Sequence, residues 1–345
     1  MAWLTKWLGR KPDGFSQPSS SRATAIPADW ATSPPHLALL QRFLSMRDTR
    51  TGVPDHWAPM FGTHPRNVVE GFLALRLLEP TSLAETIEFC HTGAELKKLL
   101  KERNLKVNGK KAEQVQRLLN ADPEAMRQLA AEHQIVRCTP GASEAVQAWL
   151  DHEAQSYEAA TDETIAALRN RQFQTAIRVA DAWRNGRFEL PVHPAQEALT
   201  IRTPPRSLEE RAAEIAKTFT LRPKILARLE PEQWEGLHLN YAIWQLLGHS
   251  TTEKCMPAFT GLGAMDSATV LRMMSFYDRH LQDLEQWKKL GVKKASIMCT
   301  NSGSCETCIA LDKKTYWLDK LPELPYQGCT CALGCRCLYR AYLGF

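Results

Sequence analysis

The sequence predicts a mainly α-helical, multi-domain protein that ends in a small β-hairpin element resembling a zinc ribbon. Over most of the 345 residues, apolar side chains recur at the i, i+3, i+4 spacing of amphipathic helices. Helix-start signals precede several of these runs. After Gly291 the pattern changes to short β-like runs set among seven cysteines. A chain of this length is expected to form two or more domains.

The composition is that of a soluble globular protein, with 44% hydrophobic and 23% charged residues. No run approaches the 18 apolar residues of a membrane-spanning helix, so we expect no membrane partner. The N-terminal stretch MAWLTKWLGRKPDG lacks the apolar core of a secretory signal. We therefore expect a cytoplasmic protein, and a nucleoid-associated one is compatible with this reading.

Residues 1–35 are predicted to be a flexible N-terminal segment, because 12–35 are rich in Ser, Pro, Ala and Thr. Residues 36–85 are predicted to form a small helical region, for which a winged-helix-like arrangement is one option. One helix covers 36–46, and a second opens at Asn67 and ends at the LRLLEP sequence.

Residues 86–122 are predicted to form a basic helical hairpin. The first helix runs from about Thr92 to Arg103, and the second starts at about Lys110. Each has an apolar stripe, formed by Leu96, Leu99 and Leu100 in the first helix and by Val115, Leu118 and Leu119 in the second. Asn108 is the expected N-cap of the second helix, whose first-turn N–H groups attract anions.

The charge of the whole chain is concentrated in this hairpin. Between Thr92 and Asn120 lie eight Lys or Arg and three Glu, a net charge of +5 that equals the +5 of the entire protein. A local basic patch of this kind is typical of a nucleic-acid footprint. The candidate DNA-binding residues are Lys97, Lys101, Arg103, Asn108, Gly109, Lys110, Lys111 and Arg117.

These residues resemble the SAP domain, a helical module of DNA-associated proteins. The pattern is Thr92-x-x-Glu95-Leu96-Lys97-x-x-Leu100-Lys101-x-Arg103-x-Leu105, then Gly109-Lys110-Lys111-Ala112-Glu113 and Arg117-Leu118. The resemblance implies binding to duplex DNA through the N-terminus of the second helix, with little direct base reading. The alternative is a solvated basic hairpin that packs against the rest of the protein.

Residues 123–290 are predicted to be almost wholly helical. Three helices are expected at Pro123–His133, Ser143–Glu158 and Asp162–Asn185. Ser207 and Glu210 form a capping box for a fourth. Asp266 or Ser267 caps a fifth, which Gly291 closes.

Residues 291–345 are predicted to form a cysteine-rich, zinc-ribbon-like tail. Short strands are expected at 292–298 and 314–319, with room for a β-hairpin between Cys308 and Cys329. The candidate metal ligands are Cys305, Cys308, Cys329, Cys331, Cys335 and Cys337. The first-choice set is Cys305, Cys308, Cys335 and Cys337, in which Cys329 or Cys331 can replace one member.

A structural Zn²⁺ is the favoured cofactor, because no His follows His280 and an all-thiolate site is closed to substrate. A redox dithiol, disulfide pairing and a two-metal cluster remain alternatives. The tail also resembles the C-terminal end of head-morphogenesis proteins of Mu-like phages. The shared pattern includes Cys305-x-x-Cys308 and Cys335-Arg336-Cys337, although Ala332 stands where that family has His.

Phosphate-binding, zinc-protease and nucleophile-elbow motifs are absent from the sequence, so nothing specific indicates an enzyme. The sequence favours a bacterial or phage DNA-binding protein with largely sequence-tolerant duplex binding and a structural zinc site. Two rivals stay open: a DNA-processing enzyme with an unrecognised active site in 123–290, and a phage head-assembly component.

Overall fold

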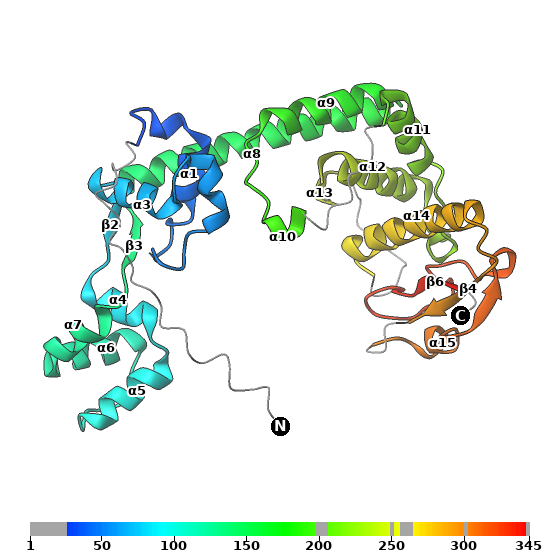
Figure 1. Cartoon of the computed structure of the whole chain (residues 1–345). Coiled ribbons are helices and arrows are strands. Elements are labelled where there is room, and N and C mark those ends of the chain that lie inside the picture. The colour runs from blue at the N-terminus through cyan, green and yellow to red at the C-terminus, as the bar shows by residue number, and fades with distance from the viewer. Residues whose placement is uncertain (1–25, 198–205, 249–251, 256–264, 300–302, 343–345) are drawn as a thin grey trace, which may run out of the picture. The chain divides into compact units, whose positions relative to one another are not determined.

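The computed structural model describes residues 26–197, 206–248, 252–255, 265–299 and 303–342. The chain divides into two compact units, one of Met1–His152 with Phe188–Ile201 and one of Glu153–Arg187 with Arg202–Phe345. Helices dominate, and the strands form two small antiparallel sheets (Figure 1). The predicted mainly α fold class is confirmed. No helix in the described ranges is both long and apolar enough to cross a membrane.

The first unit packs helices against a three-stranded sheet with the order β1-β3-β2. Apart from the helices between β2 and β3 and the first part of α8 (Pro140–Arg169), its elements are η1 (Trp30–Thr32), α1 (Pro34–Gln41), β1 (Arg47–Asp48), η2 (Asp55–Trp57), α2 (Ala58–Phe61), α3 (Pro65–Ala74), β2 (Leu78–Pro80), β3 (Ile135–Cys138) and α10 (Pro194–Glu197). Leu40 of α1 and Phe72 of α3 are fully buried and share one core with Val136 of β3. Burial of these side chains supplies the main stabilisation of the region.

The structure corrects two expectations for residues 36–85. Helix α1 ends at Gln41 rather than at residue 46, and Leu78–Pro80 forms strand β2 rather than the end of a helix. Arg76 has a φ of +56°, which is incompatible with a continuing helix. Strand β2 then pairs antiparallel with β3, in the register Leu78↔Cys138.

Four helices that we call the basic module are inserted between β2 and β3. They are α4 (Leu83–Cys90), α5 (Gly93–Glu102), α6 (Lys111–Ala121) and α7 (Pro123–Ala130). The module has its own core, in which Ile87, Leu96, Leu100 and Leu118 are fully buried. Because β2 and β3 are neighbours in one sheet, both ends of the module are anchored there (Figure 1).

The second unit contains the C-terminal part of α8 and a group of further helices. These elements are α8 (Pro140–Arg169), α9 (Phe173–Gly186), α11 (Leu208–Thr218), η3 (Lys224–Leu226), α12 (Pro231–Leu247), α13 (Thr252–Cys255) and α14 (Ser267–Lys289). One core joins Leu168, Ile177 and Ile243, and a second joins Leu237 with Met274.

The predicted capping box of Ser207 with Glu210 is confirmed, as is the Asp266 cap of α14. The helix predicted at Ser143–Glu158 is also present, although it extends further in both directions as part of α8. Two other expectations for 123–290 are wrong. Residues 135–138 form strand β3 rather than helix. The expected Asp162–Asn185 helix is broken, because Arg171 has a φ of +58° and α9 folds back along α8. The rings of Tyr157 and Trp183 meet there at 5.2 Å.

The C-terminal segment forms a second sheet with the order β5-β4-β6. Its elements are β4 (Lys294–Met298), α15 (Glu306–Ile309), β5 (Thr315–Trp317), η4 (Leu318–Lys320) and β6 (Leu338–Tyr342). The two predicted strands are confirmed. The hairpin expected between Cys308 and Cys329 is wrong, because that interval holds one strand, β5, which pairs with β4.

Candidate nucleic-acid interface and metal centre

The basic module presents its positive charges on a scaffold that is capped and internally packed. Thr92 caps α5 through a capping box, in which Glu95 accepts from the Thr92 backbone N–H at 2.7 Å. Leu96 and Leu100 of α5 pack against Val115 and Leu118 of α6. Both helices are therefore held by buried apolar contacts rather than by their charged faces.

The turn between α5 and α6 is held from within by two side chains of α6. The buried amide of Gln114 donates to the backbone carbonyls of Val107, at 3.1 Å, and of Gly109, at 3.0 Å. The guanidinium group of Arg117 donates to the carbonyls of Lys106 and Asn108. These bonds give the turn one conformation and direct its carbonyl groups inward.

The N-cap of α6 is Lys110, not Asn108 as the sequence suggests. The positive φ of Gly109, +105°, delays the start of the helix by two residues. No side chain caps this end, so the first N–H groups of α6 keep their capacity to donate to an external acceptor.

The structure separates the predicted basic residues into two groups. Lys97, Lys101 and Lys110 are exposed and Lys111 is partly exposed, and within the described residues none of the four forms an ion pair. The two arginines are engaged internally. Arg103 donates to Asp122 at 3.1 and 3.2 Å, and Arg117, besides holding the turn, lies 3.7 Å from Glu113.

Gly109 is required by the geometry of this turn. A Cβ atom there would lie 2.2 Å from Oε2 of Glu113 and 2.6 Å from Nη2 of Arg117, at a φ that disfavours L side chains. We expect Gly109→Ala to lower the free energy of unfolding of the module by about 2 kcal/mol. Gly93→Ala is the matched control, because nothing lies within 4 Å of its Cβ position. Equal unfolding midpoints in urea for the two variants would contradict this role.

The seven cysteines of the C-terminal segment converge from four places in the fold. Cys299 follows β4, Cys305 caps α15 and Cys308 lies within it, Cys329 and Cys331 lie in the loop after η4, and Cys335 and Cys337 precede β6. The β4–β6 register ends at Met298↔Leu338, so the next residues, Cys299 and Cys337, face each other. Their Sγ atoms are 3.2 Å apart.

The sulfur atoms form two groups that share one member. Those of Cys305, Cys308, Cys329 and Cys331 lie within 4.8 Å of one another, and so do those of Cys308, Cys335 and Cys337. A tetrahedral Zn²⁺ with bonds of about 2.3 Å needs S–S separations of about 3.8 Å. The cysteines therefore fit a thiolate-bound divalent metal.

The six predicted ligands come together, but not as the first-choice set of four. Cys305 groups with Cys329 and Cys331 but not with the Cys335–Cys337 pair, whereas Cys308 belongs to both groups. Cys299 was not among the six candidates. Only the pairing of β4 with β6, which the local pattern of residues does not reveal, places it in this cluster.

Backbone donors and neighbouring thiols favour the thiolate form at two of these positions. Hydrogen bonds with the thiols of Cys329 and Cys337 lower the pKa of Cys335 to about 2. Burial raises the pKa of Cys305, but donation from the backbone N–H groups of Thr330 and Cys308 outweighs it and lowers the value to about 6. Metal binding requires this deprotonated form.

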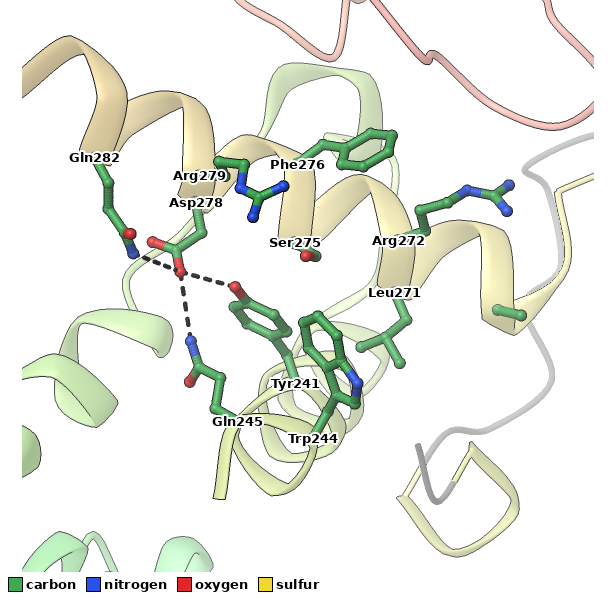
Figure 2. Close-up of a pocket in the computed structure, with 11 residues that line it drawn as sticks. Tyr241, Trp244, Gln245, Leu271, Arg272, Ser275, Phe276, Asp278, Arg279 and Gln282 are labelled. Carbon is green, nitrogen blue, oxygen red and sulfur yellow. Dashed lines mark hydrogen bonds between the residues drawn. The ribbon is translucent and has the colours of Figure 1, made fainter. Parts of the chain in front are cut away.

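The second unit also has a pocket of about 580 Å³ between α12 and α14 (Figure 2). Figure 2 shows Asp278 accepting hydrogen bonds from Tyr241 at 2.8 Å, Gln282 at 3.2 Å and Gln245 at 3.4 Å. Asp278 is the single carboxylate among the described lining residues, and all three donors bond to its Oδ2 atom. The arrangement offers no paired carboxylates for metal-assisted hydrolysis.

Comparison with known families identifies the basic hairpin. Residues 92–123 match the model of the SAP domain, so the chain contains a SAP domain that covers α5 and α6 and reaches the start of α7. No curated protein and no solved structure matches the chain. The resemblance of the tail to head-morphogenesis proteins of Mu-like phages stays a prediction.

Proposed function

We propose that this protein binds duplex DNA through its SAP domain, with little sequence preference, and that its cysteine-rich tail holds a structural zinc site. One observation carries the first part: Lys110 and Lys111, which form no ion pair within the described residues, stand at an uncapped helix N-terminus in a domain that matches a DNA-associated family. Phosphate oxygens are the ligands suited to such an arrangement.

In this proposal the predicted residues divide by task. Lys110 and Lys111, beside the free N–H groups of α6, contact phosphates directly, while Lys97 and Lys101 extend the basic surface along α5. Asn108 and Gly109 shape the turn that places these lysines. Arg117 bonds to carbonyl groups of the turn, and Arg103 pairs with Asp122. In this proposal both arginines stabilise the conformation of the domain and do not contact DNA directly.

Binding titrations of the full-length protein with duplex DNA, single-stranded DNA and RNA, each at several salt concentrations, test the proposal. We expect the tightest binding to the duplex and a linear fall of log affinity with log salt concentration. Equal binding of all three ligands, or a salt-independent affinity, would contradict it.

We expect sequence discrimination to be small, because phosphate contacts carry no sequence information directly. Competition between duplexes of different sequence should give affinity ratios well below about 10³, the lower end of the range typical of base-reading proteins. A modest preference for A·T-rich duplexes fits shape readout. An affinity for one short sequence more than about 10³ times higher than for other duplexes would contradict this expectation, because it would show that side chains contact base edges.

The candidate metal ligands in the tail are all cysteines, which supports a structural rather than a catalytic zinc site. Catalytic zinc sites keep an open position and use at least one His or carboxylate in the examples that define them. In the described residues, the side chains that gather at metal-ligand spacing are cysteines only. Four thiolates close the coordination sphere and leave no place for substrate.

A further inference from the structure

The cysteine cluster contains more thiols than one metal ion can use. A single tetrahedral ion takes four ligands, whereas seven cysteines converge here. Cys299, Cys308, Cys335 and Cys337 are buried, so they are not surface thiols that happen to lie near the site. One ion would leave three thiols of this compact core without a metal.

The spatial grouping of the sulfur atoms resolves this excess. The group of Cys305, Cys308, Cys329 and Cys331 supplies four corners of one tetrahedron. The group of Cys308, Cys335 and Cys337 supplies three corners of a second. Cys308 belongs to both groups, and its buried Sγ atom is therefore placed between the two centres.

Cys299 is the remaining thiol for the fourth corner of the second centre. Its Sγ atom lies 3.2 Å from Sγ of Cys337 and 2.8 Å from the backbone oxygen of Cys308, but not within 4.8 Å of all three sulfur atoms of that group, so its side chain must move toward them to complete the second centre. Two tetrahedral ions have eight ligand positions. Seven thiolates fill eight positions when one of them is shared.

We propose that the tail holds two zinc ions bridged by the Cys308 thiolate, with Cys299 as the seventh ligand. This inference rests on the proposed structural metal site and specifies its stoichiometry and connectivity. A bridging thiolate neutralises part of the charge of both ions, so the cluster needs fewer anionic ligands than two separate sites. Binding releases the protons of those thiols that are still protonated, and no oxidant or reductant takes part.

Elemental analysis and native mass spectrometry of the full-length protein, prepared without chelator, test the stoichiometry. We expect two zinc ions per chain in the wild type and in Cys90→Ser, the matched control outside the cluster. One ion per chain would overturn the two-metal cluster but leave the proposed single structural zinc intact. No bound metal, with all seven thiols reactive, would overturn both.

Cadmium substitution tests the connectivity. The ¹¹³Cd NMR spectrum of the exchanged protein should contain two resonances in the all-thiolate range, split by scalar coupling through Sγ of Cys308. Two uncoupled resonances would overturn the bridge. In Cys299→Ser one ion should be lost and the other retained. If that variant retained two ions, the assignment of Cys299 would be overturned. Cys329, whose thiol hydrogen-bonds to Cys335, would then act as a second bridging ligand.

Discussion

Replacing Lys110 and Lys111 together with glutamate is expected to weaken duplex binding about thirtyfold at moderate salt. Exposed ion pairs are worth roughly 0.5 kcal/mol each, so removing two attractions and adding two repulsions of similar size amounts to roughly 2 kcal/mol. The slope of log affinity against log salt concentration should flatten by about 1.8, which is 0.9 for each phosphate that the protein no longer neutralises. Fluorescence anisotropy at several salt concentrations measures both quantities.

Unfolding of the variant would not account for this result. Acidic residues are favourable at a helix N-terminus, so glutamate at the N-cap and first position of α6 should leave the helix intact, as circular dichroism can verify. Lys288→Glu with Lys289→Glu is the matched control, because these adjacent lysines are exposed, belong to α14 and lie outside the SAP domain. An equal decrease of affinity in the two double variants would show that only total charge matters.

Local sequence patterns predicted the elements whose stabilising contacts are themselves local. The stripes of Leu96 and Leu100 in α5, and of Val115 and Leu118 in α6, form the core of the basic module as expected. The capping box of Ser207 and the Asp266 cap join residues only three positions apart. Interactions over such short separations are visible in one sequence without an alignment.

Elements that depend on distant partners could not be predicted in this way. Strand β1 has two residues and β2 has three, and both exist because β3, more than 50 residues further along the chain, pairs with them. Alternation over two or three residues carries no signal that distinguishes a strand from a loop or a helix end. The break between α8 and α9 has a similar origin, since the chain reverses there to build a shared core.

In the candidate interface, too, the sequence does not predict which distant groups a single side chain contacts. The sequence indicates that Arg103 and Arg117 lie within a basic segment, but their partners are determined by the fold. Asp122 lies 19 residues from Arg103, and Arg117 bonds to carbonyls 9 and 11 residues away. Residue type predicts charge, whereas availability for a ligand depends on whether the fold supplies an internal acceptor.

Removal of the metal is expected to unfold the cysteine-rich tail while the SAP domain stays folded. Among the described residues, the buried cluster that contains the cysteines has two aliphatic members, Ile297 and Leu324; its other buried members are Cys299, Cys308, Cys335 and Cys337. An apolar core of this size cannot offset the conformational entropy of about 50 residues. Ligation energies of roughly 10 kcal/mol or more for structural zinc supply what the core lacks.

Hydrogen exchange measured by mass spectrometry, before and after treatment with a strong chelator, resolves the effect by segment. Amides of β4 and β6 should lose protection, and those of α5 and α6 should keep it. Cys308→Ser should reproduce this change without chelator, because its thiol belongs to both groups of sulfur atoms. Cys90→Ser, at the end of α4, should behave as wild type.

Contacts between the tail and α14 determine how far the unfolding spreads when the metal is removed. The ring of Tyr339 in β6 lies 4.8 Å from that of His280 in α14, and Nδ1 of His280 lies 3.3 Å from the carbonyl oxygen of Leu324. These contacts do not involve sulfur, but they depend on β6 remaining paired with β4, next to Cys299 and Cys337. We therefore expect the sheet to open once the ligands separate, with α14 itself retained. Unchanged protection of β4 and β6 in fully metal-free protein would show that the contacts to α14 hold the tail without a metal.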